Sequence, residues 1–157
     1  MTVIFYYSLT GNTKYAAEYL AQKLDVEAVR LIDQKNLDGT AVAKHDYSDL
    51  AEDPWGKMAD HDKIILMTPV WGFGIVPAMY TFIEKADLSG KSVILGCTSF
   101  FGKISSKSPL KQYTAMVEKA GGTVLGDFYV KGGTEKSYSE AKLAAGVEKV
   151  LPKIKGM

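Results

Sequence analysis

Residues 4–20 of the chain read IFYYSLTGNTKYAAEYL, and they join two different patterns. The apolar run that ends at Tyr7 predicts a buried strand, whereas Ala17, Leu20, Ala21 and Leu24 recur at the spacing of one helix face. Between the two patterns lies a corner, residues 8–13, whose side chains are mostly small and hydrogen-bonding and carry no charge. A strand that passes directly into a helix is the repeating unit of an α/β protein, so this stretch predicts that fold class.

The corner places hydroxyl and amide groups at the start of a helix. A helix start exposes backbone N–H groups and the positive end of the helix dipole, and both favour an anion. Gly11 allows the backbone to approach a ligand closely and to adopt a positive φ. The corner matches neither the Gly-x-x-x-x-Gly-Lys-Ser/Thr motif of nucleoside triphosphate sites nor the Gly-x-Gly-x-x-Gly motif of dinucleotide sites. It therefore predicts a site for one terminal monophosphate; the alternative is a polar helix cap that binds no ligand.

The rest of the chain continues the alternation of strands and helices. Five short apolar runs predict strands buried on both faces, and helical patterns separate most of them. This order predicts one parallel sheet with right-handed crossovers and helices on both faces. The predicted strands are Thr2–Tyr7, Val26–Ile32, Lys63–Thr68, Ser92–Cys97 and Thr123–Val130.

Local signals predict where the later helices begin and end. Proline suits the first helical turn, paired glycines end a helix, and a serine three residues before a glutamate is typical of a capping box. The polar stretch 33–62 has no clean helical period, and we expect only a short or irregular helix there, near Tyr47–Glu52. The other signals are a start at Pro77, a start at Ser108–Pro109 with an end at Gly121–Gly122, and a capping box of Ser137 with Glu140.

The composition is that of one ordinary globular domain, residues 1–157, with 46% hydrophobic and 24% charged residues. Cys97 is the only cysteine, so no intramolecular disulfide is possible and we expect a cytoplasmic protein. The N-terminal residues MTVIFYYS show no basic leader and no cleavage site, and we interpret them as a strand and not as a signal peptide.

The charge is balanced overall but unevenly distributed. The formal net charge of +1 argues against a strongly basic nucleic-acid binder. Residues 33–62 carry three lysines and eight carboxylates, whereas residues 63–157 carry thirteen lysines and seven carboxylates. The C-terminal half is therefore basic.

Ligands of an open parallel sheet bind beyond the carboxyl ends of its strands. Three loops follow predicted strands and are expected at that end: residues 8–13, 68–76 and 98–107.

The first of these loops carries a family resemblance. Ser8-Leu9-Thr10-Gly11-Asn12-Thr13, placed directly after the first strand, resembles the loop with which flavodoxins hold the phosphate of FMN. The resemblance extends over essentially the whole chain. It implies a flavodoxin-like three-layer sandwich with a five-stranded parallel sheet of order 2-1-3-4-5 and helices on both faces. The fifth predicted strand has no insertion, which is similar to the short-chain form.

The resemblance also implies roles for the other two loops. In Pro69-Val70-Trp71-Gly72-Phe73-Gly74, Trp71 would stack on the flavin ring and Gly72 would provide a flexible peptide beside the ring nitrogen; the alternative is that Trp71 is a core aromatic residue. The third loop is Thr98-Ser99-Phe100-Phe101-Gly102, in which a phenylalanine would pack on the second face of the flavin ring. The sequence leaves three alternatives open: Phe100 stacks on the ring, Phe101 does, or neither does. Thr98 and Ser99 would contact the ring carbonyls, and Cys97 is interpreted as a core residue.

With FMN as the cofactor, the resemblance implies a monomeric carrier that passes single electrons between a reductase and an acceptor protein. No catalytic or metal-binding residues are expected. The segments 8–14, 69–83 and 98–107, which include most of these loops, contain Lys14, Lys103 and Lys107 and no carboxylate, whereas carrier flavodoxins tend to be acidic. This departure favours partner proteins with an acidic docking face. It also leaves a second function possible for the protein itself, that of an FMN-dependent NAD(P)H oxidoreductase that reduces a quinone or a flavin. A third alternative is a flavodoxin-like interaction module without flavin.

Overall fold

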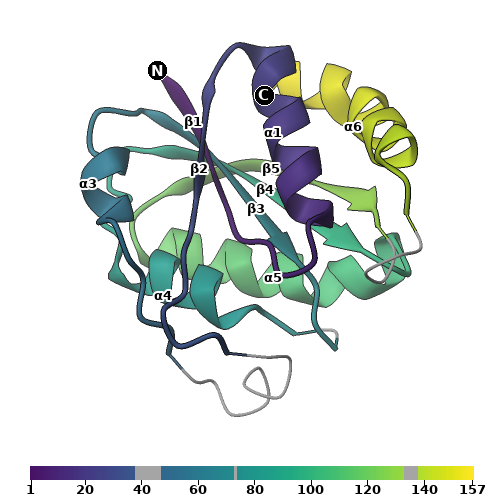
Figure 1. The fold of residues 1–157 in the computed structure, drawn as a ribbon. Coiled ribbons are helices and arrows are strands. Elements are labelled where there is room, and N and C mark those ends of the chain that lie inside the picture. The colour runs from purple at the N-terminus through teal and green to yellow at the C-terminus, as the bar shows by residue number, and fades with distance from the viewer. Residues whose placement is uncertain (38–46, 73, 133–137) are drawn as a thin grey trace.

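The structure is a computed structural model that describes residues 1–37, 47–72, 74–132 and 138–157. Its strands form a five-stranded parallel sheet in the order β2-β1-β3-β4-β5 (Figure 1). The order and the parallel pairing confirm the predicted flavodoxin-like architecture. The strands are β1 (Thr2–Tyr6), β2 (Glu27–Arg30), β3 (Lys63–Pro69), β4 (Ser92–Ser99) and β5 (Thr123–Lys131).

Helices cover both faces of the sheet, which makes three layers (Figure 1). On one face lie α1 (Asn12–Leu24) and α6 (Glu140–Lys155), which pack against each other and against the sheet. On the other face lie α3 (Pro54–Met58), α4 (Pro77–Lys85) and α5 (Lys103–Lys119). The predicted face of α1 is confirmed because Ala17, Leu20 and Ala21 are buried, and α4 begins at Pro77 as predicted.

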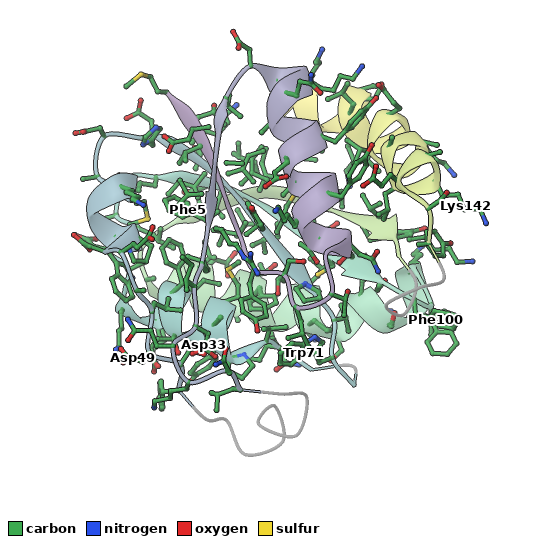
Figure 2. The ribbon with its side chains drawn as sticks, in the orientation of Figure 1. Phe5, Asp33, Asp49, Trp71, Phe100 and Lys142 are labelled. Carbon is green, nitrogen blue, oxygen red and sulfur yellow. The ribbon has the colours of Figure 1, made fainter. Side chains whose placement is uncertain are left out.

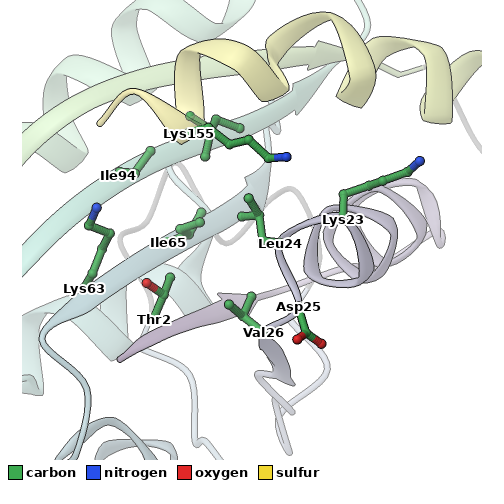
Figure 3. A pocket seen from close by; sticks show the side chains of 10 residues that line it. Thr2, Lys23, Leu24, Asp25, Val26, Lys63, Ile65, Ile94 and Lys155 are labelled. Carbon is green, nitrogen blue, oxygen red and sulfur yellow. The ribbon is translucent and has the colours of Figure 1, made fainter.

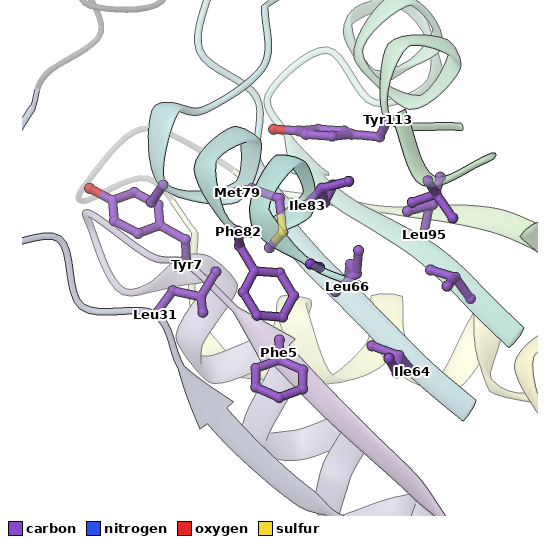
Figure 4. Close-up of a cluster of buried hydrophobic side chains, with 14 of the residues drawn as sticks. Phe5, Tyr7, Leu31, Ile64, Leu66, Met79, Phe82, Ile83, Leu95 and Tyr113 are labelled. Carbon is purple, nitrogen blue, oxygen red and sulfur yellow. The ribbon is translucent and has the colours of Figure 1, made fainter. Parts of the chain in front are cut away.

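The two cores follow from the alternation of side chains along the central strands. In β1, Val3 and Phe5 face the α4 and α5 side, whereas Ile4 and Tyr6 face the α1 and α6 side. All four are almost fully buried, because helices cover both faces of this strand. Figure 4 shows the first core, in which the Phe5 and Phe82 rings lie 4.8 Å apart.

A close approach between β4 and β5 requires a glycine. Gly96 pairs with Phe128, and a Cβ at position 96 would lie 2.4 Å from the tip of the Phe128 ring. The absence of a side chain at Gly96 therefore gives the Phe128 ring its place in the core beside α6.

The prediction that all five strands are buried on both faces is wrong for the two edge strands. In β5, Phe128 and Val130 are buried, but Leu125, Asp127 and Tyr129 are exposed. A shift in the pairing register between Val93 and Ile94 of β4 accompanies this change. In β2 only Val29 is fully buried. Edge strands have a neighbour on one side only, so part of their surface stays exposed.

The start of α5 differs from the prediction. The helix begins at Lys103, directly after Gly102, and Pro109 lies inside it. Ser99, Ser105 and Ser106 all donate their hydroxyl groups to the Gly102 carbonyl, at 2.9, 3.4 and 2.8 Å. These local hydrogen bonds anchor the first turns of α5, so Ser108–Pro109 does not act as the start signal that it resembles.

Two further helix predictions are corrected. The short helix of the polar segment is α3, not Tyr47–Glu52, because Asp53 caps it through the Gly56 N–H at 3.1 Å and Pro54 occupies its first turn. Residues 47–51 instead make hydrogen bonds outside a helix, such as the Ser48 N–H to Thr81 Oγ1 at 2.9 Å. At α6 the cap is Ser139, which accepts the Lys142 N–H; the predicted cap, Ser137, lies outside the described residues.

Candidate functional site

The three predicted loops meet at the carboxyl ends of β1, β3 and β4, and Thr98 connects them. The hydroxyl groups of Thr98 and Thr13 share a hydrogen bond of 2.6 Å, which joins the third loop to the first. The Val70 N–H donates to the Thr98 carbonyl at 3.1 Å, which joins the second loop to the third. Residues far apart in the chain therefore form one continuous site at this end of the sheet, as the parallel arrangement predicts.

The first loop has the geometry of an anion site. Gly11 has a φ of 104°, a conformation that residues with a side chain rarely adopt, and its N–H donates to Ser8 Oγ at 3.1 Å. Arg30, the only arginine of the chain, donates to the Ser8 carbonyl at 3.2 Å and braces the loop from β2. The N-cap residue of α1, Gly11, provides no side-chain cap, so this turn presents the positive end of the helix dipole at the loop.

The hydroxyl groups of this loop are not equivalent. Ser8 and Thr13 are buried, with exposed fractions of 3% and 1%, whereas Leu9 and Thr10 are exposed. Because Thr13 Oγ1 is bonded to Thr98, its main contact in this structure is within the protein. Thr10 is thus the hydroxyl that a ligand reaches first, and Thr13 also holds two loops together.

The second loop turns sharply after β3. The Trp71 ring is half-buried and meets Tyr7 edge to face, with ring centres 5.7 Å apart. The Gly74 N–H donates to the Trp71 carbonyl at 2.8 Å, which closes the turn around Gly72. Trp71 packs against the core next to Tyr7 and yet keeps part of its surface exposed. Phe73 lies outside the described residues.

A buried tyrosine holds the far end of the second loop. The Val76 N–H donates to the Tyr113 hydroxyl at 2.8 Å, and Tyr113, from α5, is 1% exposed (Figure 4). Burial raises the pKa of Tyr113 well above its usual value, so its hydroxyl group stays neutral. Burial, and then the charge of Asp33, likewise raise the pKa of Tyr7. The aromatic residues behind the second loop are therefore uncharged.

The third loop presents two exposed phenylalanine rings. Phe100 and Phe101 are 49% and 59% exposed and meet edge to face at 4.8 Å, and Phe100 projects away from the ribbon (Figure 2). The Ser99 hydroxyl is used inside the loop, where it donates to Gly102, so a contact of Ser99 with a ligand would come from its backbone. Large exposed apolar side chains at one site are typical of a surface that binds an apolar partner or ligand.

Cys97 lies directly before the third loop, but it is fully buried. Burial, and then the charge of Asp127, raise the pKa of its thiol. A thiol that is protonated and inaccessible behaves as a small core residue, in agreement with the sequence analysis.

Sequence reasoning missed three residues that shape the site: Tyr7, Arg30 and Tyr113. Tyr7 directly precedes Ser8, so its place beside the loops could have been recognised from the sequence. Arg30 and Tyr113 lie 22 and 37 residues from their partners, and the sequence contains no signal for these contacts.

A separate hollow of about 380 Å³ lies at the opposite end of the sheet (Figure 3). Thr2, Lys63 and Ile94, from the amino-terminal parts of their strands, line it, together with Leu24 and Lys155 at the carboxyl ends of α1 and α6. It shares no residue with the three loops, so the ligand site that the topology favours is a different one.

Comparison with known proteins agrees with this geometry. A family profile described as a flavodoxin domain matches residues 3–139. The chain belongs to the flavodoxin family. A flavodoxin from Maridesulfovibrio salexigens is 30% identical over 139 residues, which is 80% of this chain and 82% of that protein.

Solved structures support the family fold. A flavoprotein in complex with FMN from Lactobacillus acidophilus is 17% identical, with a TM-score of 0.64 over 82% of this chain and 91% of its own. A WrbA-like flavodoxin from Agrobacterium tumefaciens is 19% identical, with a TM-score of 0.63 over 97% of both chains.

In the described part of this flavodoxin-family chain, no helix combines the length and the apolar character that crossing a membrane requires.

Proposed function

We propose that the protein binds FMN and carries single electrons between a reductase and an acceptor protein. The observation that carries this proposal is that hydrogen bonds of Thr98 join the three loops into one site. The start of α1, without a side-chain cap from Gly11, lies at one end of this site, and exposed aromatic rings lie at the other. The solved relative with FMN shares the fold and supports the choice of cofactor. We also propose that the protein is monomeric, and that it is cytoplasmic, which its lone and buried cysteine supports.

The residues present fit FMN. The phosphate would lie at Ser8–Thr13 against the start of α1, and the apolar ring would lie between Trp71 and one of the exposed phenylalanines, Phe100 or Phe101. When bound, FMN supplies the exchangeable electrons, whereas the protein holds the ring, limits water around it and leaves one edge accessible.

The best test is the absorption spectrum of the purified protein during stepwise anaerobic reduction. A carrier should contain flavin and should take up its two electrons in two separate steps. A protein that is colourless, and stays colourless after incubation with FMN, would exclude the carrier and favour a flavin-free interaction module.

A specific feature supports a second candidate, an FMN-dependent oxidoreductase that accepts electrons from NAD(P)H. Lys14 and Lys103 are exposed and the loops contain no carboxylate, so the site would attract an anionic donor. We favour the carrier because the family match over residues 3–139 outweighs the unusual charge of the loops. Rapid, saturable oxidation of NADPH by the purified protein alone would reverse this preference.

We expect Trp71→Ala to weaken FMN binding by about 1–3 kcal/mol, because the variant loses stacking area and admits water to the ring site. The midpoint potentials should also shift, and both quantities can be followed by flavin fluorescence and redox titration. Trp55→Ala is the matched control: Trp55 packs on Phe82 in the core, so its loss should lower stability but leave the FMN affinity of the folded protein unchanged. If Trp71→Ala left the FMN affinity and the midpoint potentials unchanged, Trp71 would be a core residue that does not contact the flavin.

The exposed lysines beside the loops should govern the docking of an acidic redox partner. We expect Lys103→Glu/Lys107→Glu to slow electron exchange with such a partner, and the parent rate should fall as salt rises, because the charges act over a Debye length of about 8 Å at physiological ionic strength. Stopped-flow measurements at several salt concentrations test this, with FMN affinity as the control that must stay constant. A parent rate that is independent of salt would contradict the proposed role of these lysines.

A further inference from the structure

β5 is an edge strand with no neighbouring strand on its outer side among the described residues, and backbone groups on that side point away from the sheet. The Gly132 N–H donates to the Ser99 carbonyl of β4, and the backbone groups of successive residues in a strand alternate between its two edges. The N–H and C=O groups of Tyr129 and Lys131 therefore point to the free edge. The Asp127 carbonyl, on the same edge, accepts a hydrogen bond from Lys153 of α6. This edge can accept a further strand.

A groove of about 970 Å³ runs along this edge, with α5 on one side and α6 on the other. The two helices lie on opposite faces of the sheet (Figure 1). Six lysines line the groove: Lys103, Lys107 and Lys111 of α5, Lys131 of β5, and Lys149 and Lys153 of α6. Among the described residues that line it, Asp127 alone carries a carboxylate, and Lys153 pairs with it at 3.7 Å. The groove is therefore strongly basic although the chain as a whole is nearly neutral.

The spacing of these lysines is unfavourable for the isolated protein. Lys103, Lys107 and Lys111 follow one another at four-residue intervals on α5, and Lys149 and Lys153 do so on α6. Like charges at this spacing repel each other and destabilise a helix. Lys103, Lys107, Lys111, Lys131 and Lys149 are all exposed, and none of them forms an ion pair with another described residue. An anionic partner in the groove would relieve this repulsion.

We propose that the groove binds an extended acidic segment of a partner protein, which adds to the sheet as a strand beside β5. Main-chain hydrogen bonds to Tyr129 and Lys131 would align the segment. Side chains of an added strand point alternately to the two faces of the sheet, so its carboxylates would meet the α5 lysines on one face and the α6 lysines on the other. The proposal does not require bound flavin.

An acidic polypeptide segment fits the groove better than a second copy of the chain or a nucleic acid. A second copy of the chain, paired edge to edge through β5, would bring two rows of lysines together and would be repelled. A nucleic acid needs phosphate contacts and stacking platforms, and Tyr129 is the one aromatic side chain exposed along the described lining of the groove. The free backbone edge, in contrast, is specific for a polypeptide.

The test uses a fluorescein-labelled octa-glutamate peptide and the full chain at low ionic strength. Fluorescence anisotropy should show binding that weakens with salt, and Lys111→Glu/Lys149→Glu should weaken it by about tenfold or more. Both substituted residues lie outside the three cofactor loops, so FMN binding should not change. The matched control is Lys119→Glu/Lys155→Glu, which alters the same two helices and the same net charge outside the groove and should change the affinity by less than about threefold.

Amide hydrogen exchange provides the second measurement. In the parent protein, the peptide should protect the Tyr129 and Lys131 amides from exchange, whereas a neutral octa-glutamine peptide should not. The proposal would be overturned by absent peptide binding, by equal losses in the two double variants, or by binding without protection of these amides. Tighter binding of a single-stranded DNA octamer than of the peptide at equal salt would also overturn it, in favour of a nucleic-acid site. A failed flavin assay with intact peptide binding would affect only the proposed electron-carrier function.

Discussion

Replacing both Thr10 and Thr13 by alanine should weaken FMN binding tens-fold or more and change riboflavin binding far less. The two ligands differ in the terminal phosphate, so only contacts to the phosphate separate their affinities. Each hydroxyl donor is expected to contribute about 0.5–1.5 kcal/mol, or more because the acceptor is charged. Titration of the apoprotein with each ligand, followed by flavin fluorescence, measures both affinities directly.

The single variants refine this prediction. Thr10 is exposed and free to face the phosphate, whereas Thr13 is buried and bonded to Thr98. Thr10→Ala should therefore affect FMN alone, and Thr13→Ala should in addition loosen the third loop and cost some riboflavin affinity. Thr123→Ala, an exposed threonine at the start of β5, is the matched control and should affect neither ligand. Equal losses of FMN and riboflavin affinity in Thr10→Ala would contradict the phosphate assignment.

Phe5→Ala should lower the free energy of unfolding by about 3–5 kcal/mol, the usual cost of removing a large buried side chain. Phe5 is fully buried in the central strand β1, and its ring packs against Phe82 of α4. The loss is a large part of the total stability of a typical domain, about 5–15 kcal/mol, so the variant should unfold at a much lower urea concentration. Equilibrium urea denaturation followed by circular dichroism measures the change.

The matched control for Phe5→Ala is Phe101→Ala. The Phe101 ring is 59% exposed in the third loop, so its removal should change stability by no more than about 0.5 kcal/mol. A similar loss of stability in both variants would show that the core beside α4 is not packed as the structure indicates. The same control variant also reports on flavin binding, because Phe101 is one of the two candidates for the second ring face.

Local patterns along the chain were sufficient for the order of strands and helices. The run Thr2–Tyr7 and the run Lys63–Thr68 form central strands, and such strands are recognisable because both of their faces are buried. The corner Ser8–Thr13 was also recognisable, because hydrogen-bonding residues and a glycine at a strand-to-helix junction have few other uses. The alternation of the two kinds of element determined the fold class, whereas the order of the five strands came from the family resemblance.

Local patterns failed at two predicted helices. Ser108–Pro109 resembles a helix start, yet α5 begins at Lys103, where Ser99 of β4 helps to anchor the Gly102 carbonyl. The segment Tyr47–Glu52 contains residues compatible with a helix, but Ser48 bonds to Thr81 of α4 and Leu50 pairs with Asp33. Hydrogen bonds of the folded chain, local at the start of α5 and tertiary at Ser48, outweigh a weak local preference.

The sequence by itself determined the fold class and the positions of the three loops, because both depend on local periodicity and on the polarity of strands. Only the tertiary structure decided how the loops are joined, since the Thr13–Thr98 hydrogen bond links residues 85 positions apart. It also decided that the C-terminal lysines gather on both sides of the β5 edge. The sequence shows that these lysines are numerous, but their convergence depends on α5 and α6 packing on opposite faces of one edge strand, which no local pattern encodes.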